Sequence, residues 1–119
     1  MAVVSSTSTV GVITALNRMN LLKYFDAVVC SDMLGGRTKP APDGYRKAAE
    51  FLGEKPEDCI VIEDSPFGIQ AGKSAGMFVV GLKASEHKQD TSKADIEVSD
   101  YIELMNYWSQ MKGKICEIV

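Results

Sequence analysis

The sequence predicts an α/β fold in which a parallel, Rossmann-like sheet lies between two layers of helices. Short runs of apolar, β-branched residues alternate along the 119 residues with stretches that carry apolar residues at helical spacing. The runs are continuously apolar, as expected of parallel strands that are buried on both faces. Right-handed crossovers between such strands place helices on both sides of the sheet. We therefore expect a single three-layer domain.

Each expected strand is a short apolar run, and the fifth run is weaker than the other four. In order, the strands are residues 2–4, 27–30, 59–62, 77–82 and 94–98. The polar stretch 83–93 is expected to form a loop, and it contains the one histidine, His87. We expect His87 to lie on the surface, without a role in catalysis or metal binding.

Four helices are expected between these strands and after the last one. Ser8 or Thr9 caps the first helix, which has an apolar stripe and ends near Asn20. Two prolines place the start of the second helix near Asp43, and Gly53 ends it. The expected helices span residues 9–20, 43–52, 67–75 and 101–111.

Composition and charge narrow the classes of function. The chain is 45% apolar and 24% charged with a net charge of −3, which is typical of an ordinary globular protein. It has no stripe of Lys and Arg for a nucleic-acid backbone, no apolar run that could span a bilayer, and no recognisable signal peptide. Cys30 and Cys59 lie in apolar runs, as buried reduced thiols do. We therefore expect a cytoplasmic protein, with neither nucleic acid nor a membrane as partner.

Three polar clusters each follow one of the apolar runs. Hydroxyl residues 5–9 follow the first run, Lys39 follows the second beyond a Gly-Gly loop, and Glu63 and Asp64 follow the third. In a parallel sheet, ligands bind beyond the carboxyl ends of the strands, where these clusters would meet. A hydroxyl, an ammonium and two carboxylates gathered there can hold a phosphoryl group beside Mg²⁺.

Each cluster also has an ordinary structural interpretation, which the sequence leaves open. Residues 5–6 can form an ST-turn or a helix cap. Lys39 can be a solvated surface charge, although the prolines around it would hold it in place. Asp64 or Ser65 can cap the third helix while Glu63 points into solvent.

Three stretches of the sequence resemble motifs of the haloacid dehalogenase (HAD) superfamily. They read Val-Val-Ser-Ser, Lys-Pro-Ala-Pro-Asp-x-Tyr and Ile-Glu-Asp-Ser-x-x-Gly-Ile-x-Ala-x-x-x-Ala-Gly-Met, in the order and spacing of the family. The chain is most similar to the β-phosphoglucomutase-like phosphatases, over residues 2–102. The resemblance implies a three-layer core of the HAD type.

The resemblance also implies a role for each matching residue. Ser5 corresponds to the hydroxyl that hydrogen-bonds the phosphoryl group, and Ser6 lies beside it in the substrate-binding segment. Lys39 corresponds to the lysine that stabilises the phosphoryl oxygens. Glu63 and Asp64 correspond to the acids that hold Mg²⁺. The implied reaction is Mg²⁺-dependent phosphoryl transfer from a small phosphorylated metabolite of the sugar-phosphate type.

The sequence departs from the family pattern at its front. The family begins with a strand that ends in Asp-x-Asp, which supplies the nucleophile and the acid/base, and a helical cap domain follows. This chain opens on the next motif and contains no Asp-x-Asp. We therefore expect residues 1–119 to form one partial HAD-like core domain, without the first central strand and the cap. Such a chain would be inactive alone, because it lacks the nucleophile.

The missing strand would leave a slot in the sheet, between the strands at 2–4 and 59–62. Unpaired strand edges are a liability, and the tail 114–119 has the alternating, β-branched pattern of a strand. Our hypothesis is that this tail, from its own or a neighbouring molecule, occupies or covers an exposed edge. The alternative is a frayed terminus or an ordinary outer strand. The corresponding partner would be a second copy in a homodimer or a complementing N-terminal segment.

Three functions remain open at this point. The first is the C-terminal core of a Mg²⁺-dependent phosphatase or phosphomutase, which leaves open whether this chain alone is an enzyme. The second is a non-catalytic protein of the same fold that binds phosphate or metal, or serves in assembly. The third is a flavodoxin-like protein that binds a flavin phosphate with residues 5–9. This third function gives no role to Lys39 or to the acid pair.

Overall fold

The computed structural model describes residues 1–83, 86, 88–110 and 116–118, and it confirms the α/β fold with a parallel sheet. His87 lies outside the described residues, so its surface position stays a prediction. The strands are β1 (Ala2–Ser5), β2 (Ala27–Cys30), β3 (Cys59–Glu63), β4 (Phe78–Leu82), β5 (Ile96–Val98) and β6 (Cys116–Ile118). The α-helices are α1 (Thr9–Arg18), α2 (Asp43–Leu52), α3 (Pro66–Ser74) and α4 (Tyr101–Gln110).

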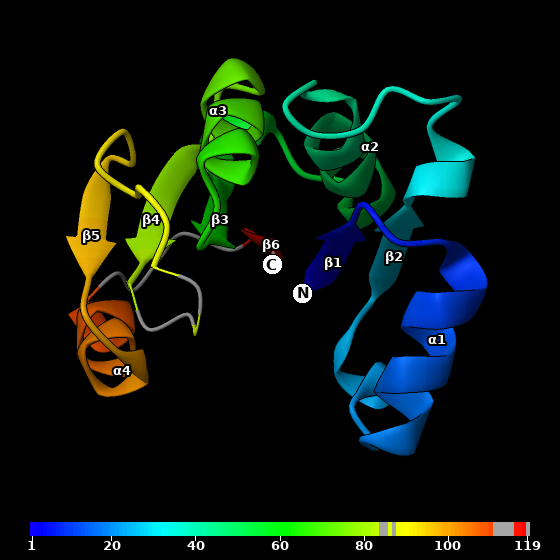
Figure 1. The fold of residues 1–119 in the computed structure, drawn as a ribbon, viewed down its shortest axis with the longest axis horizontal. Helices are drawn as coiled ribbons and strands as arrows, with labels where there is room; N and C mark the ends of the chain where they lie inside the picture. Colours follow the sequence, from blue (N-terminus) through cyan, green and yellow to red (C-terminus); the bar gives the residue numbers. More distant parts are fainter. Residues whose placement is uncertain (84–85, 87, 111–115, 119) are drawn as a thin grey trace.

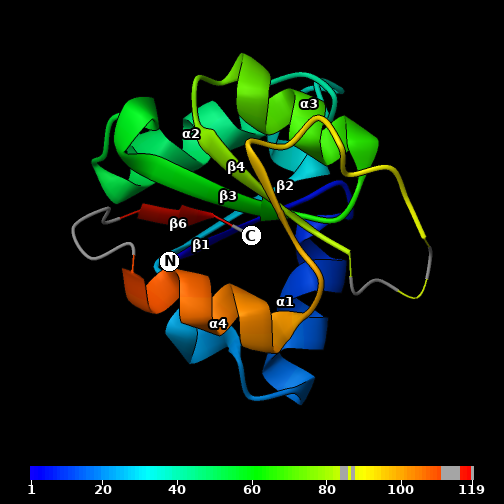
Figure 2. The ribbon, with the colours of Figure 1, turned by 90° about the vertical axis from the view of Figure 1, so that its left-hand side faces the viewer.

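The helices form two layers on opposite faces of the sheet. Helices α2 and α3 cover one face, and α1 and α4 lie on the other (Figures 1 and 2). This is the arrangement that right-handed crossovers between parallel strands produce. It leaves the carboxyl ends of the strands at one edge of the sheet, where the polar clusters follow.

The strand order in the sheet is β2-β1-β6-β3-β4-β5, and every strand pair is parallel. The last strand, β6, therefore lies between β1 and β3, which confirms for residues 116–118 that the tail enters the slot. Residues 114, 115 and 119 lie outside the described part of the chain. The described residues of β6 pair with β3 at three positions and with β1 at one, where Ile118 is opposite Ala2.

Side chains of the strands alternate between two apolar cores. Val61 belongs to the core under α2 and α3, whereas its neighbour Ile60 belongs to the core beside α4, and both are fully buried. Burial of side chains of this size contributes about 1.5–3 kcal/mol each. Because the pattern has a period of two, the residue after Ile62 projects to the same face as Val61. That residue is Glu63, the last residue of β3.

The observed element ends differ from the predicted ones at a few positions. Ser8 caps α1 by accepting a hydrogen bond from the backbone N–H of Gly11, at 3.4 Å. The helix ends at Arg18, because the chain turns through a left-handed conformation at Asn20, where φ is 56°. Strand β3 continues one residue beyond the predicted run, to Glu63.

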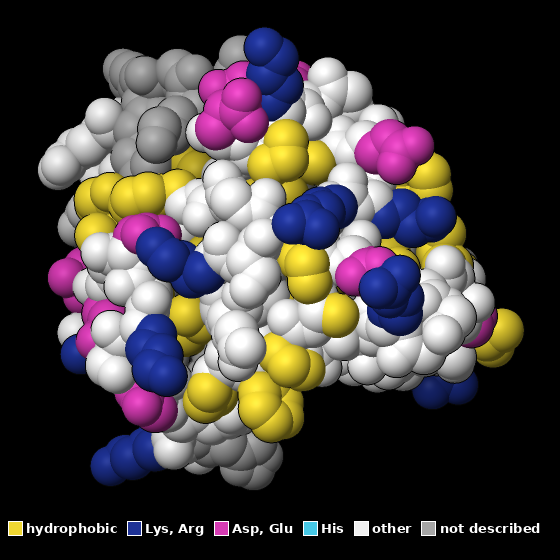
Figure 3. Space-filling model, turned by 90° about the horizontal axis from the view of Figure 1, so that it is seen from above, with side chains coloured by type: hydrophobic (Ala, Val, Ile, Leu, Met, Phe, Trp, Pro, Cys, Tyr) yellow, Lys and Arg dark blue, Asp and Glu magenta, His cyan; other side chains and the backbone are white. Residues whose placement is uncertain are grey.

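The surface over α2 and α3 carries charges of both signs. Figure 3 shows Lys and Arg side chains interspersed with Asp and Glu on this face, with apolar side chains between them. Neighbouring charges of opposite sign offset one another, so this face does not present a continuous field of a single sign. Among the described residues, no helix is long and apolar enough to cross a membrane.

Candidate functional site

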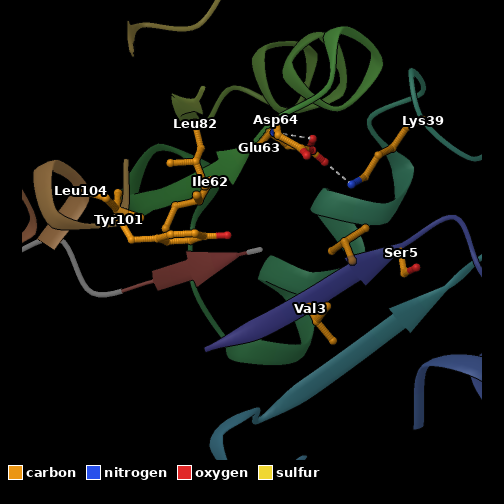
Figure 4. Close-up of a pocket in the computed structure, with 10 residues that line it drawn as sticks. Val3, Ser5, Lys39, Ile62, Glu63, Asp64, Leu82, Tyr101 and Leu104 are labelled. Atoms are coloured by element: carbon orange, nitrogen blue, oxygen red, sulfur yellow. Dashed lines mark hydrogen bonds and ion pairs between the residues drawn. The ribbon is translucent and has the colours of Figure 1, made fainter. Parts of the chain in front are cut away.

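A cavity of about 470 Å³ opens at the carboxyl ends of β1 and β3. One wall comes from β1, with Ser5 at its end, and the other from the end of β3, with Glu63 and Asp64. Lys39 reaches the same cavity from the loop before α2 (Figure 4). The remaining lining residues are apolar or aromatic: Val3, Val4, Ile62, Leu82, Tyr101 and Leu104. The structure therefore brings Ser5, Lys39, Glu63 and Asp64 to one cavity, whereas Ser6 is exposed and does not line it.

Glu63 is the centre of the polar network in this cavity. Its side chain is 7% exposed, and its carboxylate accepts hydrogen bonds at both oxygens. Oε1 accepts from the ammonium of Lys39 and from the Tyr45 hydroxyl, the latter at 2.8 Å. Oε2 accepts from the backbone N–H groups of Asp64 and Ser65, both at 3.1 Å, and from the Ser65 hydroxyl at 3.0 Å. The suggestion that Glu63 points into solvent is therefore wrong.

These donors decide the ionisation of Glu63. Burial alone would raise the pKa of its carboxyl, because a low-dielectric site disfavours the charged form. The Lys39 ammonium, the Tyr45 hydroxyl and the backbone N–H of Ser65 outweigh that effect and hold the pKa of Glu63 below its ordinary value. Glu63 is therefore a carboxylate at neutral pH.

The turn after β3 is built to hold this carboxylate. Ser65 caps α3 by accepting a hydrogen bond from the backbone N–H of Gly68 at 3.1 Å, while its own hydroxyl donates to Glu63. Gly68 is essential to the geometry, because a Cβ atom at this position would lie 2.0 Å from the Glu63 carboxyl carbon. The sequence predicted a cap from Asp64 or Ser65, and the structure shows that Ser65 supplies it.

Lys39 lies between Glu63 and the ring of Tyr45. Its side chain is 16% exposed, and its Nζ lies 5.0 Å from the centroid of the ring. A cation in this position is attracted by the electron-rich face of the ring. The alternative of a solvated surface lysine is therefore wrong, and the ammonium is held at the edge of the cavity.

Tyr45 is the residue that the sequence did not predict to be part of the site. It is fully buried in α2, and the sequence pointed to it only as the last residue of the Lys-Pro-Ala-Pro-Asp-x-Tyr motif, without a role in the site. Burial and the adjacent charge of Glu63 raise the pKa of its hydroxyl far above the usual value, so this group stays protonated and donates. The shared motif, in which Tyr45 follows Lys39 by six residues, is the signal that could have linked the two side chains.

The β1 side of the cavity is held by local hydrogen bonds. Ser5 Oγ accepts from the backbone N–H of Thr7 at 3.1 Å, which is the ST-turn that the sequence left open. The Ser5 hydroxyl proton can still be donated to an anion, since this contact uses only the oxygen as acceptor. Thr9 donates through its N–H and its hydroxyl to Asp32, at 3.0 and 2.8 Å. Several groups of a flavin-phosphate loop would thus be engaged within the protein.

Asp64 differs from its neighbour. It is exposed, and none of the described residues donates a hydrogen bond to its carboxylate. The described residues contain no group of three or more His, Cys, Asp and Glu side chains that could enclose a metal. Mg²⁺ nevertheless binds through one or two carboxylates and keeps several waters. In the present conformation, the carboxylate of Asp64 is suited to bind such an ion. Glu63 is suited to bind it if one of its present hydrogen-bond donors moves away.

The structure defines an α/β protein with a polar cavity at the carboxyl ends of its parallel strands, and comparisons with known proteins identify the family. The model of the haloacid dehalogenase-like hydrolases matches residues 1–82. The chain therefore belongs to the haloacid dehalogenase-like hydrolase family, and its relatives place it in the β-phosphoglucomutase-like subgroup.

Named relatives match this chain over part of their own length. A validoxylamine A 7'-phosphate phosphatase from Streptomyces hygroscopicus subsp. limoneus is 36% identical over 91 residues, 76% of this chain and 42% of that protein. A β-phosphoglucomutase from Bacillus subtilis (strain 168) is 45% identical over 67 residues, 56% of this chain and 29% of that protein. The structure of a putative β-phosphoglucomutase from Thermotoga maritima superimposes with a TM-score of 0.79 and 31% identity, over 92% of this chain and 52% of that one. The chain thus spans less than half the length of these two curated relatives.

Proposed function

We propose that this chain is the C-terminal core of a Mg²⁺-dependent phosphatase or phosphomutase that acts on a small phosphate ester of the sugar-phosphate type. The observation that carries the proposal is the meeting of Ser5, Lys39, Glu63 and Asp64 at one cavity at the strand ends. The names of relatives support the substrate class, since they include a fructose-1-phosphate phosphatase from Escherichia coli and a β-phosphoglucomutase. We place the protein in the cytoplasm, which the buried thiol of Cys30 supports.

Each residue has a distinct task in this proposal. The hydroxyl of Ser5 donates to a phosphoryl oxygen, and Ser6 contributes to binding from the same segment. Lys39 offsets the negative charge of the transferring group, which is the main electrostatic demand of phosphoryl transfer. Asp64, with Glu63 beside it, holds Mg²⁺, which would supply further charge neutralisation. These residues stabilise charge, but none of them is placed to attack phosphorus.

The nucleophile has to come from outside residues 1–119, because these residues contain no Asp-x-Asp. The slot between β1 and β3 is a suitable place for the strand that carries it. Among the described residues, β6 is paired with β1 at Ala2 only, and Val3, Val4 and Ser5 of β1 line the cavity. A complementing N-terminal segment that displaces β6 from the slot and adds a longer parallel strand would pair with this edge. A homodimer that exchanges β6 would leave the same part of the edge open.

A phosphatase assay tests the proposal. We expect no turnover of p-nitrophenyl phosphate by this chain alone in the presence of Mg²⁺. Addition of a separate polypeptide with an apolar strand ending in Asp-x-Asp is expected to restore hydrolysis. That activity should be lost in Lys39→Met and Asp64→Asn, and retained in the exposed control Lys23→Met. Turnover by the chain alone that survives Asp64→Asn would contradict the proposal.

One observation favours a second function, that of a non-catalytic protein that binds phosphate or metal. The chain's own tail already lies in the slot, as β6. In a protein that had given up catalysis, this tail would complete the sheet permanently. Binding of phosphate and Mg²⁺ without restored turnover in the assay above would support this second function.

A further inference from the structure

Lys39, which is proposed to meet a phosphate, and Glu63, which is proposed to meet a cation, form an ion pair with each other in this structure. The Lys39 ammonium donates to Oε1 of Glu63, and both side chains are largely buried. An ammonium that is bound to a carboxylate has part of its charge offset, so it attracts a phosphate less strongly. In the same way, the Oε1 atom that faces Lys39 is less available to a divalent cation.

We propose that Lys39 is an internal counterion which a divalent cation displaces from Glu63, so that cation binding and phosphate binding are coupled. The inference rests on the proposed function and states how the two halves of that site regulate each other. A cation at Asp64 and Glu63 would replace the charge of Lys39 on the Glu63 carboxylate. The released ammonium would then be available to an anion in the cavity.

Lys39 is the donor best able to leave Glu63. Two of the other donors are backbone N–H groups of the turn, and the Ser65 hydroxyl belongs to the cap of α3. The Tyr45 hydroxyl is fixed by a fully buried ring. Lys39, by contrast, is a flexible side chain that already lines the cavity of about 470 Å³. It can move into that space while the four remaining donors keep Glu63 in place.

Asp64 gives the displacing cation its first contact. Its carboxylate is exposed, adjoins Glu63 in the chain, and receives no hydrogen bond from the described residues. A hydrated cation can therefore bind Asp64 before Glu63 is recruited. A compact divalent ion beside two carboxylates interacts more strongly than a single ammonium does, because the interaction scales with charge.

Thermodynamic linkage requires the coupling between cation binding and phosphate binding to be reciprocal. If the cation raises the affinity for phosphate by a given factor, phosphate raises the affinity for the cation by the same factor. Typical couplings of this kind are about 5- to 150-fold, and we expect about tenfold here. The coupling depends on the charge of Lys39, and it does not depend on turnover.

Calorimetric titrations of the full chain test the inference. Mg²⁺ is titrated with and without saturating inorganic phosphate, and phosphate is titrated with and without saturating Mg²⁺. In the wild-type chain each ligand is expected to bind about tenfold more tightly in the presence of the other. In Lys39→Met, Mg²⁺ alone should bind more tightly than in the wild type, and the coupling should disappear.

Lys23→Met is the matched control. Lys23 is an exposed lysine that also lies over an aromatic ring, with its Nζ 5.3 Å from the centroid of Tyr24, and its removal changes the net charge by the same amount. We expect it to keep the coupling of the wild type. The wild-type titrations stand by themselves if Lys39→Met does not fold.

The outcomes separate this inference from the proposed function. Mg²⁺ and phosphate that bind the wild-type chain independently would overturn the inference, while the phosphatase assay could still succeed. Weaker Mg²⁺ binding in Lys39→Met would also overturn it, since a competitor for Glu63 would have been removed. Loss of turnover in the complemented assay together with intact coupling would leave the inference standing without the catalytic proposal.

Discussion

The two walls of the cavity are built differently. On the β3 side, Glu63 is held by five donors, and Ser65 ties the same turn to the start of α3. On the β1 side, Ser5 makes a local turn contact with Thr7, and the described residues of β6 pair with β1 at one position. Within the described part of the chain, the β3 wall is thus complete, whereas the β1 wall has backbone left to pair. The difference indicates that the Glu63 turn is fixed by its own hydrogen bonds, whereas the β1 side of the cavity still has room for a further strand.

The largest loss of stability is expected from Glu63→Ala, on the β3 side of the cavity. It leaves the largely buried Lys39 ammonium without its counterion, and the loss of one partner of such a pair typically costs about 3–5 kcal/mol. Urea unfolding followed by circular dichroism measures the change. Asp43→Ala is the control, because it removes a carboxylate from a more exposed pair with Arg37 and should cost no more than about 1 kcal/mol. Equal losses in both variants would contradict a preformed β3 wall.

The pH dependence of the free energy of unfolding tests whether the charge of Glu63 stabilises the β3 side. The folded-state pKa of Glu63 is depressed, so its ionic contribution is fully present above the unfolded value of about 4.3 and is lost as the pH falls through the folded-state pKa. The difference in unfolding free energy between the wild type and Glu63→Gln is therefore expected to shrink in that acidic range. A difference that stays constant from neutral pH down through this range would show that the carboxylate charge is not what stabilises the turn.

The smallest effect on stability is expected from Ser5→Ala on the β1 side. The substitution removes one acceptor from a partly exposed turn, which should cost about 1 kcal/mol or less. The affinity for inorganic phosphate should fall measurably in the same variant, because the hydroxyl donor is lost. A large loss of stability with unchanged phosphate affinity would mean that Ser5 is a structural residue only.

The sequence predicted the meeting of the three clusters because strand ends of a parallel sheet share one edge. Ser5, Lys39 and Asp64 each follow a strand, so their approach needed only the topology. The ion pair between Lys39 and Glu63 could not be predicted in this way, because it depends on how two side chains 24 residues apart are oriented. One available signal was overlooked. If β3 is extended by one residue, the alternation of side chains along a strand places Glu63 on the same face of the sheet as Val61.

The position of the tail followed from a different kind of reasoning. Its β-branched, alternating pattern predicted a strand, and the slot left by the family's central strand suggested where it would pair. The register could not be predicted, since three residues carry too little pattern to distinguish one alignment from another. That register matters for the site, because the described residues of β6 pair with β1 at Ala2, and Ser5 lines the cavity.

The most direct test of the central claim, that one cavity joins both walls, is a titration followed by backbone amide NMR. Phosphate and Mg²⁺ are added together to the labelled chain, and the amides of Ser5 and Asp64 are observed. We expect both amides to shift along the same binding curve, and we expect Lys39→Met to disrupt this common behaviour. Shifts of one amide without the other, or two different binding curves, would contradict a single site.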